Sequence, residues 1–318
     1  MADILIYRVP GKNTIELDGE FKEIDSLSSG SGFVVTSFKK DKIYSFDSGK
    51  GEGEMVLDAV DLMCISKEKY QKNASVFLNQ IKNQNLYKAV FSRIKEVSFR
   101  TNARQLFHCL SEEYPQAFVY LISSPLFGTW VGATPEYLLS VDHEKSKTIA
   151  LAGTMRSDDS EIWGAKEINE QEYVCSFIRD RLAQLNIESV NEKEKKELIA
   201  GPVKHLATTF TFSNQGVGIA DLVDVLHPTP AVSGLPQRES IALIDELEKH
   251  ERSLYSGVIG VINEDDAQLF VNLRCAQLTA DKAYLYLGGG FTADSDIDKE
   301  WIETENKART LLNVLENL

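Results

Sequence analysis

The order of strand-like and helix-like segments constrains the fold of this chain more than any other feature of its sequence. Runs that alternate or are rich in β-branched and aromatic residues follow one another with only short turns between them, as in AFVYLISS, TWVGA, EYLLSVD and KTIALAG. Apolar residues at helical spacing occur between such groups, near residues 69–83, 102–114, 159–185 and 238–250, and again at the C-terminal end. Single helices between groups of strands favour an α+β fold with antiparallel sheets over a doubly wound α/β fold.

The length and composition predict one sizeable domain. A chain of 318 residues with 43% hydrophobic content can bury a substantial core. Residues 1–66 form a strand-rich lead-in without recognisable chemistry, and residues 67–318 carry the motifs described below. Because no low-complexity linker divides the chain, we expect residues 1–318 to form a single domain.

Charge and cysteine content narrow the possible partners. A net charge of −14 argues against nucleic acid or an anionic membrane as the main partner. An acidic protein that acts on an anion needs converging Lys and Arg side chains, or a divalent cation held by carboxylates. The four cysteines lie far apart without a C-x-x-C pair, which is typical of reduced thiols. Without a signal-like N-terminus or a run approaching ~18 apolar residues, we expect a cytoplasmic protein.

The segment LGGGFTADSDIDKEWIETENKARTLL combines a predicted triple-glycine turn with the start of an acidic helix. Glu300, Glu303 and Lys307 fall on one helical stripe, close to a turn whose N–H groups can approach an anion. The alternative is a capped surface helix. In that interpretation, Asp296 or Asp298 lies near the N-terminus, and Glu303 and Lys307 form a simple i,i+4 pair.

Two polar residues in apolar strands are candidates for acid–base chemistry. Lys88 opens the run KAVFSR, where it is either a charged residue protecting an edge strand or a desolvated amine able to act as a base or nucleophile. Glu136 follows a Thr-Pro turn at the head of an apolar strand. It is either an exposed strand-start carboxylate or a buried general acid with a raised pKa.

Three further residues also admit two interpretations. Glu170 lies within a predicted helix and can be solvated or face inward. His227, in the proline-rich loop LHPTPAVSG, is either a structural histidine or part of a site. Arg274, within the apolar run LFVNLRCAQL, must find an anion, which is either a structural glutamate or a substrate carboxylate.

Taken together, these motifs resemble those of the chorismate-binding enzymes. This family contains isochorismate synthases, salicylate synthases, and the large subunits of anthranilate and aminodeoxychorismate synthases. The resemblance covers roughly residues 67–318 and follows the family's motif order: KAVFSR, GATPEYLL, LAGT, KEINEQEYV, LHPTPAVSG, RSLYSGVIG, NLRCAQL, LGGGF and SDIDKEWIETENK. It implies a layered α/β/β/α sandwich with mostly antiparallel sheets.

The resemblance also implies a substrate and a metal. The substrate is chorismate, and Mg²⁺ is held by glutamates that match Glu170 and Glu303, with Glu300 of the metal-side helix as a third metal residue. Arg274 matches the arginine that grips a substrate carboxylate. The other positions expected to contact substrate are Gly153, Thr154, His227, Ala231, Gly288 and Lys307.

Two positions indicate the subfamily. Aminodeoxychorismate synthases carry a nucleophilic lysine at the position of Ala152, and anthranilate synthases carry glutamine at the position of Lys88. The combination in this chain is similar to enzymes that activate water. It implies an isochorismate synthase, an isomerase in which Lys88 is the general base and Glu136 the general acid. The alternatives are a salicylate synthase, a non-catalytic chorismate-binding protein, and an ammonia-dependent enzyme with a glutaminase partner, which Lys88 disfavours.

Some positions depart from the family pattern. Glu170 is followed by Gln171 where a Glu-His pair is common, the turn reads GGGF where GAGI is more usual, and the region ahead of Lys88 is short. None of these departures removes a proposed catalytic group. We expect a monomer without an obligate glutaminase subunit, whose product serves menaquinone, siderophore or other salicylate-derived biosynthesis.

Overall fold

The computed structural model describes residues 2–49, 53–99, 102–158, 160, 162–200 and 203–318, without the side chains of residues 154, 156, 166, 200 and 203. The helices are α1 (Lys67–Asn83), α2 (Ala103–Glu113), α3 (Ala165–Gln184), α4 (Ile219–Leu226), α5 (Gln237–Leu247) and α6 (Ile297–Leu315), with a 3₁₀ turn at Leu27–Ser29. The first strands are β1 (Asp3–Arg8), β2 (Ile15–Glu23), β3 (Gly32–Thr36), β4 (Ile43–Ser48), β5 (Lys88–Ser98), β6 (Phe118–Ser124), β7 (Gly128–Thr134), β8 (Tyr137–Asp142) and β9 (Lys145–Arg156). The remaining strands are β10 (Val190–Glu192), β11 (Lys196–Ala200), β12 (Val203–Ser213), β13 (Gly234–Leu235), β14 (Val258–Asn263), β15 (Asp266–Val271), β16 (Cys275–Leu278) and β17 (Lys282–Phe291).

The ladders between these described strands are all antiparallel, which confirms the predicted α+β class. Many of them join distant parts of the chain. β17 pairs with β5 from Lys282 opposite Ser98 to Phe291 opposite Ala89, and β1 pairs with β6. Neighbouring strands such as β6 and β7 form hairpins, as the expected meander requires.

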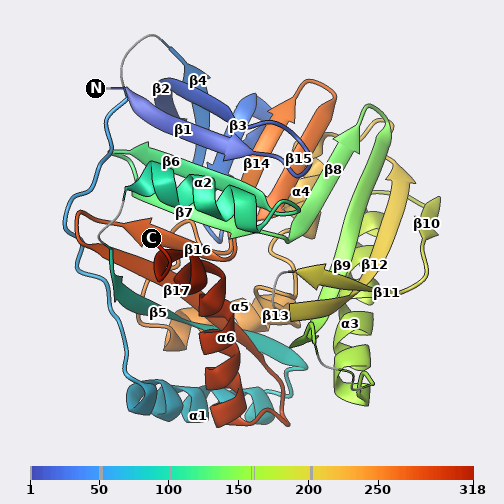
Figure 1. The fold of residues 1–318 in the computed structure, drawn as a ribbon. Coiled ribbons are helices and arrows are strands. Elements are labelled where there is room, and N and C mark those ends of the chain that lie inside the picture. Colours follow the sequence, from blue (N-terminus) through green and yellow to red (C-terminus); the bar gives the residue numbers. More distant parts are fainter. Residues whose placement is uncertain (1, 50–52, 100–101, 159, 161, 201–202) are drawn as a thin grey trace.

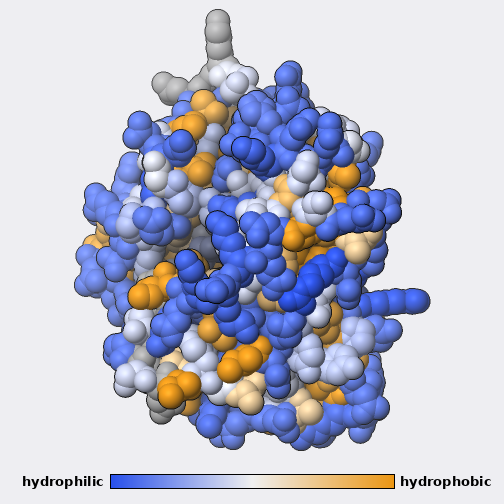
Figure 2. Space-filling model, turned by 90° about the vertical axis from the view of Figure 1, so that its right-hand side faces the viewer, coloured by the Kyte–Doolittle hydropathy of each residue, from blue (hydrophilic) through white to orange (hydrophobic). Residues whose placement is uncertain are grey.

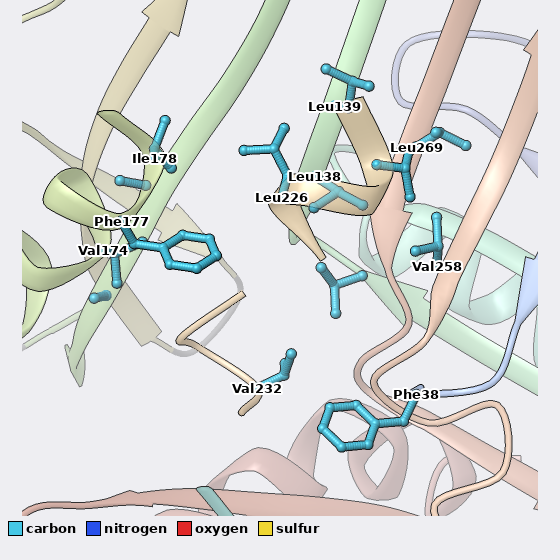
Figure 3. Close-up of a cluster of buried hydrophobic side chains, with 14 of the residues drawn as sticks. Phe38, Leu138, Leu139, Val174, Phe177, Ile178, Leu226, Val232, Val258 and Leu269 are labelled. Atoms are coloured by element: carbon cyan, nitrogen blue, oxygen red, sulfur yellow. The ribbon is translucent and has the colours of Figure 1, made fainter. Parts of the chain in front are cut away.

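Three buried clusters show how the layers pack. Aromatic residues such as Phe118, Trp130 and Phe270 form a cluster drawn almost entirely from strand residues. A second cluster packs α1, α3, α4 and α5 against strands, and Figure 3 shows the part of it around Phe177 and Leu226. A third packs α2 and α6 against other strands. Helices therefore cover sheet surfaces that meet one another through the aromatic cluster, as expected for an α/β/β/α sandwich (Figure 1).

Several elements differ from the sequence prediction. The run NEKEKKEL, which has no apolar alternation to indicate a strand, contributes to β10 and β11, and its charged side chains face solvent from these edge strands beside β12. The predicted helix over 159–185 begins only at Ala165, after Gly164. The short helix α4 was not predicted. Residues 288–290 lie within strand β17 rather than in a turn, and Arg274 falls between β15 and β16 rather than inside one strand.

The surface and the thiols agree with the composition. The face shown in Figure 2 is mostly hydrophilic with small, separate apolar patches. All four cysteines are free thiols. Among the described residues, no helix is long and apolar enough to cross a bilayer.

Candidate functional site

A cavity of about 100 Å³ brings together side chains that are far apart in the sequence. They come from β5, α3, α6, β17 and the turns before β8 and β16. The predicted site residues that line it are Lys88, Glu136, Gly153, Glu170, Ala231, Arg274, Gly288, Glu303 and Lys307.

The Lys88 amine is buried rather than placed at a sheet edge. Its residue is 5% exposed, and β5 is flanked by β13 on one side and by β17 on the other. Lys88 Nζ forms an ion pair with Glu170 Oε1, so Glu170 faces inward from α3. A buried ammonium needs such a partner, because removing an unpaired charge from water is costly.

Glu136 is a buried carboxyl that can hold a proton at neutral pH. Its backbone is fixed at the head of β8 by hydrogen bonds from Glu136 N to Thr134 Oγ1 (3.3 Å) and from Val271 N to Glu136 O (2.9 Å). Burial raises the pKa of Glu136 to about 7, although Lys88 and two other cations act in the opposite direction. Among the described residues, its carboxyl group makes no hydrogen bond, which leaves it available to a ligand in the cavity.

The glycines of β17 make room for the charged groups. A Cβ atom added to Gly290 would lie 2.6 Å from Lys88 Cε, and one added to Gly288 would lie 2.7 Å from the Tyr255 hydroxyl. On the facing helix α6, Lys307 Nζ donates to Gly288 O (2.8 Å) and pairs with Glu303 Oε1 (2.6 Å). The predicted stripe on α6 therefore faces the glycine strand, and both Glu303 and Lys307 line the cavity.

Arg274 has a partly buried guanidinium that no anionic group of the described residues pairs with. The residue has a positive φ of 51° between β15 and β16, and its carbonyl accepts from Ala133 N (3.1 Å). Burial lowers the pKa of Arg274, while Glu303 and Glu136 act to raise it. Within the described part of the chain, its guanidinium makes no hydrogen bond or ion pair. This favours the second of the two predicted partners, an anionic ligand.

The loop before α5 is held in place by a buried arginine. Arg252 donates from Nη1 to Val232 O (2.7 Å) and from Nη2 to Val90 O (3.0 Å), and it pairs with Glu248. These bonds tie the HPTPAVSG loop to β5, which places Ala231 at the cavity wall.

Two of the predicted site residues lie outside the cavity wall. His227 is buried outside the cavity wall, where its Nε2 bonds to Phe38 O (3.0 Å), and burial lowers the pKa of His227 to about 3. Glu300 is also buried away from the cavity, and its Oε1 accepts from Ser295 Oγ (2.7 Å). The side chain of Thr154 lies outside the described residues.

Sequence reasoning missed several residues of the cavity wall, and His205 and Tyr255 are two that carry polar groups. His205 of β12 bonds through Nδ1 to Gly153 O (2.8 Å), and burial lowers the pKa of His205 to about 4, so its ring is neutral at pH 7. Burial also raises the pKa of Tyr255 to about 12. Tyr255 lies in the quoted motif RSLYSGVIG, which was a usable signal, whereas His205 stands in an ordinary strand pattern without one.

Comparison with known proteins identifies the family. A family model described as "Chorismate binding enzyme" matches residues 39–316. The chain belongs to the family of chorismate-binding enzymes. Isochorismate synthase EntC of Escherichia coli is 31% identical over 246 residues, an alignment that spans 71% of this chain and 62% of EntC, somewhat less than two thirds of that relative. The MenF protein of Mycobacterium tuberculosis is 32% identical over 253 residues, covering 72% of this chain and 68% of MenF.

Solved structures of the family share the fold. The DhbC protein of Bacillus anthracis superposes with a TM-score of 0.84 at 23% identity, over 99% of this chain and 96% of DhbC. MenF of Escherichia coli, the menaquinone-specific isochorismate synthase, also gives a TM-score of 0.84, at 19% identity over 98% of this chain and 88% of MenF. At these identities the similarity shows the architecture, which is the layered sandwich expected from the sequence.

Proposed function

We propose that this chorismate-binding enzyme is an isochorismate synthase. The observation that carries the proposal is the pairing, in one cavity, of a buried amine at Lys88 with a buried carboxyl at Glu136 that is able to hold a proton near neutral pH. A base and an acid of this kind are what addition of water at one ring carbon and loss of hydroxide from another require. The named isochorismate synthases among its relatives support the same assignment.

Glu170 of α3 and Glu303 of α6 fit a magnesium site. Both carboxylates line the cavity. Each pairs with a lysine ammonium group, Glu170 with Lys88 and Glu303 with Lys307, which shows that both positions stabilise a nearby positive charge. Carboxylate oxygens are the ligands that Mg²⁺ prefers. When bound, the ion would fix and neutralise the ring carboxylate of chorismate. Glu300 lies behind Gly289, and we propose that it supports the metal side without contacting substrate.

Lys88 and Glu136 then divide the reaction between them. Lys88 acts as the free amine, after losing the proton that it holds in its ion pair with Glu170, and takes a proton from a water molecule whose oxygen forms a bond to C2 of the ring. The ring double bonds shift, the C4–oxygen bond breaks, and Glu136 protonates the departing hydroxyl group. One water enters and one leaves, so the overall reaction is an isomerisation.

The remaining residues of the cavity bind and orient the substrate. Arg274 offers its guanidinium to a substrate carboxylate, and Lys307 and the Gly288 backbone contact the substrate beside it. We keep Gly153, Thr154 and Ala231 as proposed contacts, and leave out His227, which does not line the cavity. Ala152 lines the cavity at the position where aminodeoxychorismate synthases carry a nucleophilic lysine. Because alanine has no amine to attack the ring, this enzyme cannot use their covalent route.

The second candidate is a salicylate synthase, which would use the same base and metal and then eliminate pyruvate from isochorismate. A non-catalytic chorismate-binding protein is disfavoured, because all four acid–base and metal residues line the cavity. We further propose a cytoplasmic monomer that needs no glutaminase subunit, and whose product serves menaquinone or siderophore synthesis.

The deciding experiment is incubation of the purified protein with chorismate and Mg²⁺, with and without EDTA, followed by chromatography. Isochorismate formed only with free Mg²⁺ and without pyruvate is the expected result. Stoichiometric salicylate and pyruvate would identify the salicylate synthase. Chorismate binding without turnover would indicate the non-catalytic protein.

A further inference from the structure

A second cavity, of about 520 Å³, adjoins the catalytic one, and we call it the outer cavity. Residues of α2, α6, β9 and β11 line it. In Figure 1, α2 and α6 lie to the left of β9 and β11. Pro135, Leu151 and Arg274 line both cavities. These three residues therefore form the partition between the outer cavity and the catalytic site.

The wall of the outer cavity is largely apolar and aromatic. Tyr114 and Tyr137 contribute rings, and Ile149 contributes an aliphatic side chain. Leu198 and Ile199 of β11 also line it while remaining 38% and 67% exposed, respectively. Large apolar side chains left in water beside a concave surface are a feature of ligand sites.

Arg274 gives this apolar cavity a cation at its base. Its positive charge interacts electrostatically with Tyr114 of the outer cavity, and with Tyr255, Glu303 and Glu136 of the catalytic cavity. Because no described protein group pairs with the guanidinium, an anion from either side can bind it. The acidic residue in the outer cavity, Glu113, is exposed.

We propose that the outer cavity binds a small aromatic monocarboxylate, with the carboxylate on Arg274 and the ring against Tyr137, Leu198 and Ile199. The volume lies within the roughly 300–1,000 Å³ usual for small-molecule sites. A single cation at the base and apolar walls favour one carboxylate on a flat hydrocarbon ring over a polyanion or a sugar.

Sharing Arg274 couples the outer cavity to the catalytic site. An aromatic acid bound outside holds the guanidinium that the substrate carboxylate needs inside, so each ligand weakens binding of the other by the same factor. This part of the inference rests on the proposed function, whereas the existence of the outer site does not.

The test measures binding of benzoate to the purified protein by isothermal titration calorimetry, without chorismate. Leu198→Glu and Ile199→Glu place a carboxylate at the rim of the outer cavity, outside the catalytic machinery. Each should weaken benzoate binding about 10-fold, equivalent to about 1.4 kcal/mol. Val76→Glu adds the same charge at a similarly exposed apolar position on α1 (46% exposed), and should leave the affinity unchanged.

Chorismate turnover separates this site from the catalytic cavity. Without benzoate, the rim variants should convert chorismate at the wild-type rate, and added benzoate should inhibit the wild type more strongly than either rim variant. Benzoate affinity equal in the wild type and both rim variants would place the acid in the catalytic cavity and overturn the proposal. Absence of binding at about 10 mM benzoate would also overturn it.

The outcomes for the two proposals can be told apart. Calorimetry needs no turnover, so rim-sensitive benzoate binding by a protein that leaves chorismate unchanged would refute the isochorismate synthase and keep the outer site. A raised KM for chorismate in the rim variants, without benzoate binding, would show that the outer cavity is only a path for substrate and would refute the site.

Discussion

Burial gives single residues of this site properties that their types do not have in water. Glu136 shows the effect most clearly, because its carboxyl lies in a cavity wall where ionisation is unfavourable. Arg274 and Lys88 are cations withdrawn from bulk water, and such a cation needs an anionic partner. Glu170 is that partner for Lys88, and we propose a substrate carboxylate for Arg274. The chemistry proposed here therefore depends on where the chain places ordinary side chains.

We predict that replacing Glu136 by Gln stabilises the fold at alkaline pH. The pKa of Glu136 in the folded protein is raised from 4.5 to about 7, so its contribution to stability is complete below about pH 4.5 and is lost as the pH rises through 7. Relative to Glu136→Gln, the wild type should lose about 3 kcal/mol of unfolding free energy between pH 4.5 and 8. Urea denaturation of both proteins across this range measures the difference. A constant difference would show that the pKa of Glu136 is the same in the folded and the unfolded protein.

The same group should limit catalysis at high pH. Because the proposed acid must carry a proton, turnover should decline as the pH rises through about 7, and Glu136→Gln should lose about 10²–10⁴-fold in kcat at its optimum. A pH profile of kcat checks this expectation. An unchanged alkaline limb in a Glu136→Gln variant with residual activity would assign that limb to another group.

Replacing Lys88 by Ala should abolish turnover and preserve magnesium-dependent binding of chorismate. The base contributes to the chemical step by an expected 10²–10⁴-fold, whereas Arg274 and the metal ligands remain in place. Calorimetric titration with chorismate, with and without Mg²⁺, checks the binding. Equal loss of binding and turnover would mean that Lys88 is needed for the structure of the cavity.

At this scale the sequence grouped some residues of the candidate site correctly in space and misplaced others. Lys88, Glu136 and Arg274, singled out by residue type and motif position, line one cavity. The position of His227 between apolar and proline residues also indicated a site, yet its ring is hydrogen-bonded to the backbone carbonyl of Phe38. Only the packing of distant segments decides such a case, and a single sequence does not contain that information locally.

Among the elements, strand β17 and its partner β5 set the dimensions of the site. Residues 288–290 lack side chains where β17 passes the Lys88 side chain and helix α6. The sequence indicated a turn there, since consecutive glycines usually mark one. Their role in this strand is instead to leave space for neighbouring groups, which becomes visible only once β5 and α6 are in position.

We predict that Gly290→Ala lowers activity without unfolding the protein. The new methyl group would meet Lys88 Cε at 2.6 Å and displace the amine from its present position. A displacement of this size at a catalytic group is expected to cost on the order of 10²-fold in kcat. Gly49→Ala is the matched control, because its added Cβ would meet only Gly19 Cα at an ordinary 3.6 Å. Kinetic assays and circular dichroism of both variants make the comparison, and equal activities would contradict this role of Gly290.

Helices α3 and α6 each bring one proposed metal ligand to the cavity. Glu303→Gln should therefore remove the thermal stabilisation that Mg²⁺ gives to the wild type, which is about 2.7 kcal/mol at 100 times the dissociation constant. Glu316→Gln, at the exposed C-terminal end of α6, should retain it. Melting curves with Mg²⁺ or EDTA test the pair. Stabilisation retained in Glu303→Gln would exclude this residue from the ligands.

Over the whole molecule, the predicted fold class and the helices and strands of the motif-bearing region agree with the structure. The grouping of apolar strands contained this information, because antiparallel sheets with single intervening helices leave few alternatives. The sequence did not indicate the charged edge strands β10 and β11 or the short helix α4. None of these three elements is long enough to show a clear periodic pattern of apolar residues. The expected single domain over residues 1–318 stays a prediction.

The long-range pairing of β5 with β17 also bears on how the protein is made. Ala89 and Phe291 are paired in a ladder whose strands are separated by most of the motif-bearing region, and Glu303 and Lys307 follow still later. On the ribosome, the polypeptide thus carries its proposed base and acid long before the strand and helix that complete the cavity emerge. Contacts of such high sequence separation form slowly, so chorismate conversion should begin only after release of the finished chain.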